Sequence, residues 1–226
     1  MSRYYNGSSH TKITGHSIPT GSNARFISCW VKSVDVTVRQ FFLSQQPDNG
    51  RFALEIRGGS PSYFAVNWFG GAILGTVIAA ANDTWFHVMA SRGSGGGIDL
   101  FVNATADGTS GGAGFSATGT DLYIGALNAT PTLPLTGEVD DIVCGVSAGS
   151  PYSGEWAAAL YAGIPPIKFM DTAGQRCVTW MPVDNDFVDY RLNGATIVTD
   201  GSTEGSGRPT ARCRMRPAIA KPRRGF

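Results

Sequence analysis

Two acidic residues in the second half of the chain have the spacing of paired catalytic carboxylates. Glu138 and Asp140 lie two positions apart in the segment Glu138-Val-Asp-Asp-Ile142. If this segment is a β-strand, its side chains alternate between two faces, so both carboxylates point the same way. A retaining glycosidase needs two carboxyl groups about 5–5.5 Å apart, one as the nucleophile and one as the acid/base. The next position on that face is Ile142, which cannot transfer a proton.

The other reactive side chains form no recognisable catalytic or metal-binding pattern. His87 follows a Trp-x-His pattern, and we expect it to be a hydrogen-bonded strand histidine. The glycine runs at 93–97 and 111–114 lack the lysine and the following helix of a phosphate-binding loop. The four cysteines lie far apart without Cys-x-x-Cys spacing, so we expect buried reduced thiols at Cys29, Cys144, Cys177 and Cys213. The sequence therefore argues against an enzyme.

The composition predicts short strands joined by turns. Only 15% of the 226 residues are charged, and 30 glycines and 12 prolines interrupt the chain. Such a composition disfavours long solvated helices. Asp48-Asn-Gly50 is a hairpin signal between two apolar segments. Strands are predicted at 25–32, 39–44, 51–57, 63–68, 73–78, 85–90, 97–102, 122–125, 137–146, 177–181 and 190–198, a pattern typical of a sandwich or barrel.

One short helix is predicted near residues 153–162. Ser150 and Pro151 are a cap and a first helical residue, and Gly163 ends the segment. Trp156 and Leu160 fall on one side of this helix, which we expect to pack on a sheet.

The order of these segments resembles a laminin-G-like jelly roll of the concanavalin A-like lectin/glucanase superfamily. The resemblance rests on residues 24–33, 82–90, 98–103, 122–125 and 135–143, followed by the helix. It implies an all-β fold, a two-sheet antiparallel jelly-roll sandwich, over residues 1–200. We expect the inner faces of the two sheets to enclose Phe26, Trp30, Trp85, Phe101 and Tyr123. Residues 178–182 and 189–194 also resemble the end of jelly-roll proteins of tailed bacteriophages.

The resemblance has consequences for the site. Glucanases of the superfamily carry Glu-x-Asp-x-Glu on one strand face, and because Ile142 stands at the third position we expect no catalysis. The superfamily often holds Ca²⁺, for which the weak candidates are Asp99, Asp121, Asp140 and Asp141. We expect no other cofactor. For a glycan, the candidate contacts are Trp68 and Phe69 at a strand end.

The end of the chain, residues 201–226, is predicted to be an extended basic arm. It contains six basic residues from 212 onward and no acid after them, whereas the remaining chain has twelve basic and seventeen acidic residues, a net charge of −5. An arm of this kind could dock onto an acidic neighbouring subunit. Nucleic acid is a poorer partner, because no aromatic residues are interleaved with the charges. The docking candidates are Arg212, Arg214, Arg216, Lys221, Arg223, Arg224 and Phe226.

These observations lead to an expected function. We expect a non-enzymatic bacteriophage virion protein, a capsid decoration or a neck- or tail-associated subunit, that joins other virion proteins as a homo-oligomer or in a multi-copy assembly. The alternative is a carbohydrate-binding module for host glycans. No signal peptide or apolar run of about 18 residues is visible, so we expect synthesis in the bacterial host cytoplasm and no membrane partner.

Overall fold

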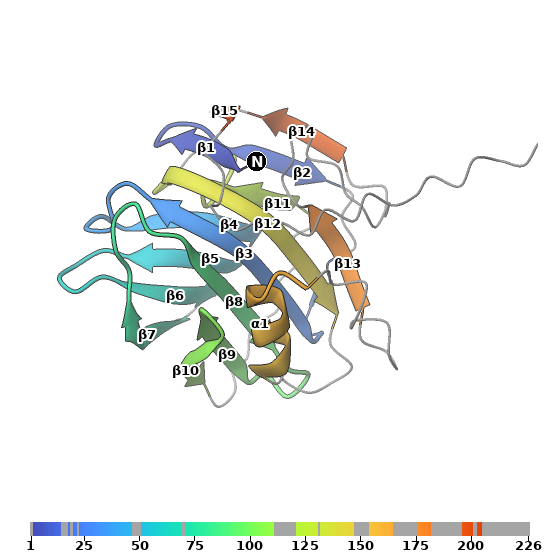
Figure 1. Ribbon diagram of the computed structural model, residues 1–226. Helices are drawn as coiled ribbons and strands as arrows, with labels where there is room; N and C mark the ends of the chain where they lie inside the picture. Colours follow the sequence, from blue (N-terminus) through green and yellow to red (C-terminus); the bar gives the residue numbers. More distant parts are fainter. Residues whose placement is uncertain are drawn as a thin grey trace, which may run out of the picture.

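A computed structural model shows the strands arranged in two antiparallel sheets (Figure 1). The structure describes residues 2–14, 18, 20–21, 23–46, 51–68, 71–110, 121–130, 132–146, 154–164, 176–181, 196–200 and 203–204, of which residue 46 and the last three segments are described by their backbone alone. Within these segments there are fifteen strands and one helix. The expected all-β, two-sheet antiparallel sandwich is confirmed.

Sheet A is built around the long strand β12, whose two sides pair with β3 and with β1. β13 pairs with the second half of β12, beyond β1. The order of the sheet is β10 (Thr105–Ser110), β9 (Ile98–Val102), β8 (Phe86–Arg92), β3 (Arg25–Ser33), β12 (Thr136–Val146), β1 (Arg3–Asn6) and β15 (Thr203–Glu204), with β13 (Arg176–Met181) beside β12.

Sheet B lies against sheet A and contains the two hairpins that matter most for the site. β4, β5, β6 and β7 follow one another in the chain and in space, each pairing with the next. The order of the sheet is β14 (Thr196–Asp200), β2 (Thr11–Thr14), β11 (Asp121–Ile124), β4 (Gln40–Gln46), β5 (Phe52–Arg57), β6 (Tyr63–Trp68) and β7 (Gly71–Ala79).

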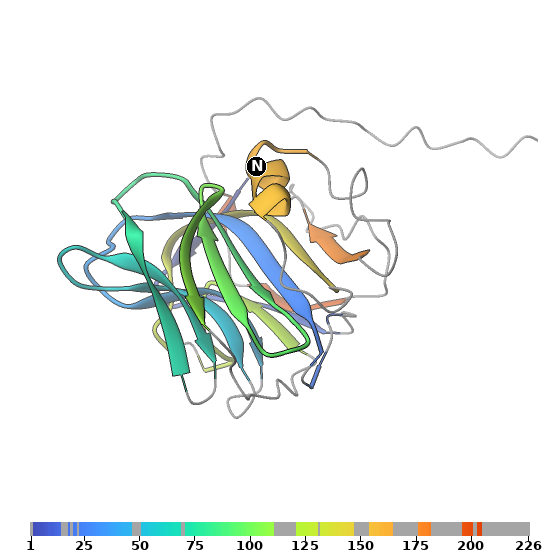
Figure 2. The same ribbon diagram turned by 90° about the horizontal axis from the view of Figure 1, so that it is seen from below.

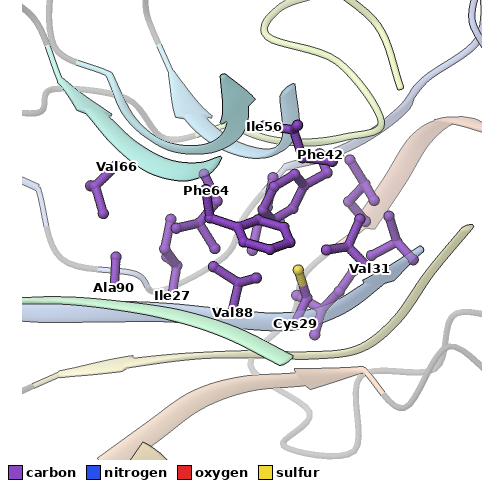
Figure 3. Close-up of a cluster of buried hydrophobic side chains, with 14 of the residues drawn as sticks. Ile27, Cys29, Val31, Phe42, Ile56, Phe64, Val66, Val88 and Ala90 are labelled. Carbon is purple, nitrogen blue, oxygen red and sulfur yellow. The ribbon is translucent and has the colours of Figure 1, made fainter. Parts of the chain in front are cut away.

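The hydrophobic core fills the space between the sheets (Figure 3). Strand β3 contributes Ile27, Cys29 and Val31 from sheet A, two residues apart, because alternate side chains of a strand share a face. From sheet B, Phe42 and Phe64 meet edge to face with ring centroids 6.3 Å apart. Burying a side chain of this size stabilises the fold by about 1.5–3 kcal/mol.

Helix α1 (Gly154–Tyr161) covers the outer face of sheet A, on the side away from sheet B (Figure 2). The Trp156 ring meets Phe26 of β3 edge to face, with centroids 5.7 Å apart. The predicted helix is thereby confirmed, whereas its predicted start signals at 150 and 151 lie outside the described residues. The second buried cluster consists of Phe26, Met89, Phe101, Val143, Trp156, Ala157 and Leu160.

The predicted inner faces were partly wrong. Phe26, Trp30 and Phe101 are buried, but on the outer face of sheet A beneath α1. Tyr123 lies on the outer face of sheet B, and Trp85 is only half-buried. The physical reason is that the helix adds a third layer, so both faces of β3 are covered and its sequence shows no polar side.

A buried carboxylate joins the two sheets at their open edge. Asp107 of β10 accepts hydrogen bonds from the backbone of β7 at Val77 N (2.6 Å) and Ile78 N (3.0 Å). Gly75 of β7 lies so close that a Cβ there would come 2.0 Å from the Asp107 carboxylate. The contact between β7 and β10 at this edge therefore depends on the carboxylate of Asp107, which an apolar side chain could not replace. No described helix has the length and apolar character needed to cross a membrane.

Candidate functional site

The outer face of sheet B carries a charged network that the strand period of β5 creates. Phe52, Leu54 and Ile56 point into the core, so Ala53, Glu55 and Arg57 point outward, with Arg51 just before the strand. Arg39 precedes the neighbouring strand β4, and Asn67 and Tyr63 lie on β6, opposite Ala53 and Arg57. We name the set Arg39, Arg51, Glu55, Arg57, Tyr63 and Asn67 the arginine face.

Glu55 is the centre of the arginine face and is completely buried. Its Oε2 lies 2.6 Å from Arg39 Nε, and its Oε1 lies 3.2 Å from Arg57 Nε. Asn67 Nδ2 donates to Glu55 Oε1 at 3.4 Å, and Asn67 Oδ1 in turn accepts from Arg51 Nε. A buried carboxylate is costly unless it is paired and hydrogen-bonded. Glu55 is both, and it ties three arginines to one network.

Each of the three arginines contacts Glu55 or Asn67 through its Nε atom. Each contact with the network uses Nε, and within the described part of the chain the terminal Nη nitrogens make no hydrogen bond. The side chains of Arg39 and Arg57 are 34% and 37% exposed. Arg39 also lies over the Phe41 ring, 5.1 Å from its centroid. With three arginines and one glutamate, the arginine face has a formal charge of +2.

An aromatic side chain borders this charge. Tyr63 is paired with Arg57 across the sheet and is half-buried. Its hydroxyl makes no hydrogen bond with any described residue. A ring with one free polar end suits a ligand that is part apolar and part polar.

Next to the arginine face, the same sheet surface is closed. Leu127, after β11, packs with Phe41 and Ala53. Beyond them Tyr123 and Lys12 are cross-strand neighbours, and Lys12 Nζ lies 2.9 Å from Asp121 Oδ2. The hydrogen bond to Asp121 raises the pKa of Lys12, and burial raises the pKa of Tyr123. Here each polar group already has a protein partner.

Sheet A brings together a serine and a histidine that sequence spacing could not connect. Ser28 Oγ and His87 Nε2 lie 2.7 Å apart, and both residues are buried. Trp30 stacks on Tyr161 of α1 with ring centroids 5.4 Å apart, and both rings contact His87. His87 is therefore a hydrogen-bonded strand histidine, as its Trp-x-His context predicts. Within the described part of the chain, α1 and its aromatic rings cover this pair, and Ser28 and His87 are 0% and 1% exposed.

The paired carboxylates Glu138 and Asp140 lie on the same outer face, and both are buried. Glu138 pairs with Lys32 Nζ at 2.5 Å and also accepts a hydrogen bond from Ser2. The expectation that Ile142 continues this face was wrong. β12 has a bulge between Asp140 and Val143, with Asp141 at φ 47°, and it turns Ile142 into the core.

A known protein family matches most of this chain. Residues 6–144 match the family model of the concanavalin A-like lectin/glucanases superfamily. The chain belongs to this superfamily. A comparison with curated protein sequences finds no match.

Three solved structures share the superfamily sandwich with this chain. A heptameric SAP-like pentraxin from Limulus polyphemus is 12% identical with a TM-score of 0.62, covering 89% of this chain and 93% of its own. A Bacteroides ovatus protein assigned to carbohydrate binding is 15% identical with a TM-score of 0.61, covering 82% and 51%. Domain 4 of AbnA, an extracellular GH43 arabinanase from Geobacillus stearothermophilus in complex with arabinotriose, is 17% identical with a TM-score of 0.54, covering 71% and 76%. At such identities the likeness shows the fold alone.

The four aspartates suggested for calcium, which superfamily members often bind, do not come together. Asp99 accepts a hydrogen bond from Thr109 in sheet A, whereas Asp121 pairs with Lys12 in sheet B. Asp140 accepts a hydrogen bond from the Asp141 backbone. Among the described residues, no group of three or more His, Cys, Asp or Glu side chains could hold a metal ion.

The other predicted site residues are elsewhere or undescribed. Trp68 packs against the core between the sheets and lies close over Gly71, so it does not form a platform on the outer face. Phe69 and the arm residues 212–226 lie outside the described residues. Cys29 and Cys144 are buried cysteines that form no disulfide within the described residues, and burial together with the nearby Asp140 raises the pKa of Cys29.

Sequence reasoning missed the arginine face, although one signal was visible. In Arg51-Phe-Ala-Leu-Glu-Ile-Arg57 the charged residues fall on alternate positions opposite three large apolar ones. This pattern predicts a charged outer face of a half-buried strand. It does not identify Arg39 or Asn67, which join the network only through the pairing of β4, β5 and β6.

Proposed function

We propose that this protein is a non-catalytic carbohydrate-binding module whose ligand site is the arginine face. The observation that carries the proposal is a set of arginines fixed by Nε to buried acceptors, whose terminal nitrogens make no hydrogen bond with a described residue, beside the half-buried Tyr63. Sugars bind proteins through ring faces and fixed hydrogen-bonding groups. The carbohydrate assignment of one structural neighbour and the bound arabinotriose of another support the proposal.

The carboxylates support a binding role over hydrolysis. Glu138 is buried and paired with Lys32, and Ile142, at the third position of the Glu-x-Asp-x-Glu motif, lies in the core. Glu55 has its oxygens occupied by Arg39, Arg57 and Asn67 and does not face a ligand. We expect no cleavage of β-glucans by the purified protein. Turnover that disappears in Glu138→Gln would contradict this.

The binding proposal is tested with the full-length protein on a panel of immobilised polysaccharides, followed by calorimetry on those that bind. Tyr63→Ala removes the ring beside Arg57 and is expected to weaken binding by about tenfold, the value of one aromatic contact. The matched control is Tyr161→Ala, since Tyr161 is a partly exposed tyrosine on the opposite side of the molecule. Binding to no polysaccharide, or equal loss in both variants, would contradict the proposed site.

A second proposal concerns the setting in which the module acts. We propose that it is displayed on a tailed-bacteriophage virion, as a capsid decoration or a neck or tail subunit, and that residues 212–226 attach it to neighbouring virion proteins. The charge asymmetry between the basic arm and the acidic remainder favours this, together with the resemblance of residues 178–182 and 189–194 to phage jelly-roll proteins.

The arm is tested by deletion. Without residues 212–226 the chain is expected to fold but to leave its assembly, and raised salt is expected to loosen the intact protein, because exposed ion pairs are screened. Normal occupancy of the truncated chain in the assembly would contradict attachment by the arm. Neither outcome bears on glycan binding, which the arginine face provides.

A further inference from the structure

We infer that the ligand of the arginine face is an anionic saccharide, a chain that bears carboxylate, sulfate or phosphate groups. This inference rests on the proposed carbohydrate-binding function and names its ligand class. It starts from the charge of the face, where three arginines surround one glutamate. The remaining +2 has no counter-charge among the described contacts of these side chains.

The way in which the arginines are held defines what they recognise. A guanidinium is a planar fork that matches carboxylate, sulfate and phosphate oxygens with two parallel hydrogen bonds. In Arg39 and Arg51 the Nε already donates to Glu55 or Asn67, so the terminal nitrogens are the edge left for a ligand. Because Glu55 and Asn67 are buried and already hold Nε, the arginine side chains are ordered before binding, and less conformational entropy is lost when an anion binds.

The positions of the arginines suit a chain more than a single ion. Arg39 and Arg57 flank Glu55, one at each carboxylate oxygen. Arg51 comes from the other end of β5, but its side chain contacts Asn67, which in turn contacts Glu55. The three cationic side chains therefore converge on one network. A saccharide with acidic groups on neighbouring units contacts several of these guanidinium groups at once, whereas a small single ion contacts fewer.

The neighbouring groups favour a saccharide over a nucleic acid. Single-stranded nucleic acid binds where several aromatic rings stack on successive bases. Among the described residues one ring, Tyr63, borders the cations, while Phe41 is buried beneath Arg39 and Leu127.

Matched polymer pairs test the inference on the full-length protein. The probes are polygalacturonate with its methyl ester, and dextran sulfate with dextran, each measured by calorimetry at two salt concentrations. We expect the acidic member of at least one pair to bind at least about tenfold more tightly than its neutral partner, and more weakly at higher salt. Arg39→Gln, Arg51→Gln and Arg57→Gln are each expected to weaken this binding about five- to tenfold.

Three controls accompany these variants. Lys12→Gln removes a cation of the same sheet face that Asp121 already pairs, and it is expected to change binding less than about twofold. Arg57→Lys keeps the charge but loses the fork and is expected to restore part of the affinity. A full-length variant with all six basic arm residues changed to glutamine is expected to bind as the parent does. Thermal unfolding of each variant shows that it is folded.

Several results would overturn the inference. Equal affinity for acidic and neutral polymers would refute it while leaving carbohydrate binding in place. Loss of binding in the arm variant but not in the arginine variants would assign the anion to the arm. Equal binding of polyglutamate, DNA and the acidic polysaccharides would show general anion attraction. If no neutral or acidic polysaccharide binds, the proposed function itself fails.

Discussion

The two outer faces of the sandwich have similar residues and opposite accessibility. Each has a buried glutamate paired with a basic side chain: Glu138 with Lys32 on sheet A, and Glu55 with two arginines on sheet B. On sheet A, α1 and its aromatic residues cover the neighbouring polar side chains. On sheet B, Leu127 covers Phe41 and Ala53, whereas the side chains of Arg39 and Arg57 are about one third exposed among the described residues.

The difference in accessibility between the two outer faces indicates which of them can bind a ligand. The Ser28–His87 pair has the chemistry of an active site, yet it is buried beside Trp30 and Tyr161 of α1. The carboxylates of Glu138 and Asp140 are buried as well, and Glu138 is paired with Lys32. The arginine face has no such pair, but it presents hydrogen-bond donors that no described residue accepts from. Accessibility therefore decides between the faces, and the side-chain types on their own would have favoured sheet A.

The largest effect is expected from removing the cover of sheet A. Trp156→Ala deletes the ring that meets Phe26 and leaves a cavity beneath α1. Truncation of a buried tryptophan or phenylalanine costs about 3–5 kcal/mol in the free energy of unfolding. Chemical denaturation measures this loss. Polysaccharide binding should be unchanged in the folded variant, and a change in affinity would mean that the two faces are coupled.

The two glutamates provide the most direct test of the comparison. Glu55→Gln removes the charge that anchors Arg39 and Arg57, and we expect it to cost about 1–3 kcal/mol and to weaken ligand binding. Glu138→Gln breaks the pair with Lys32 and should cost a similar amount while binding persists. Denaturation and calorimetry on both variants measure the two effects. Equal loss of binding would remove the distinction between the faces.

A smaller effect is expected from the hydrogen bond between Ser28 and His87. Ser28→Ala removes the 2.7 Å contact within the covered face of sheet A and should cost about 1–2 kcal/mol. The expected result is a lower midpoint of denaturation without any change in binding. If the variant lost a measurable hydrolytic activity, the Ser–His pair would be catalytic and accessible, contrary to the cover described.

The strands and the helix could be predicted because their signals are local. Apolar segments predicted β3, β5, β6 and β12, and the residues around Trp156 predicted α1. The strands that the sequence did not reveal are β1, β2, β10 and β15, which are short and rich in polar residues. They belong to the sheets through their pairing with neighbours, a long-range effect that no local pattern records.

Which face a residue occupies was harder to predict. Both Phe26 and Ile27 are buried, one beneath α1 and the other between the sheets, and their residue types do not distinguish these environments. The bulge at Asp141 shifts the period of β12, so counting by two from Glu138 gives the wrong face for Ile142. The sequence of β5 predicts part of the arginine face, but Arg39 and Asn67, which contact Glu55, come from other strands.

The smallest predicted effect concerns His10, a partly exposed histidine near Tyr123 on sheet B, in contrast to the buried His87 of sheet A. Partial burial and the nearby Lys12 lower the pKa of His10 below its usual 6.5. Below pH 6.5 the unfolded chain therefore binds a proton more readily than the folded protein does, so this histidine makes the fold less stable as the pH falls. An NMR titration should place the His10 midpoint below 6.5. In His10→Gln, the loss of stability between pH 7.5 and 5.5 should be smaller than in the parent. A His10 midpoint above 6.5 would contradict this, because it would require a net attractive partner for the imidazolium on this face.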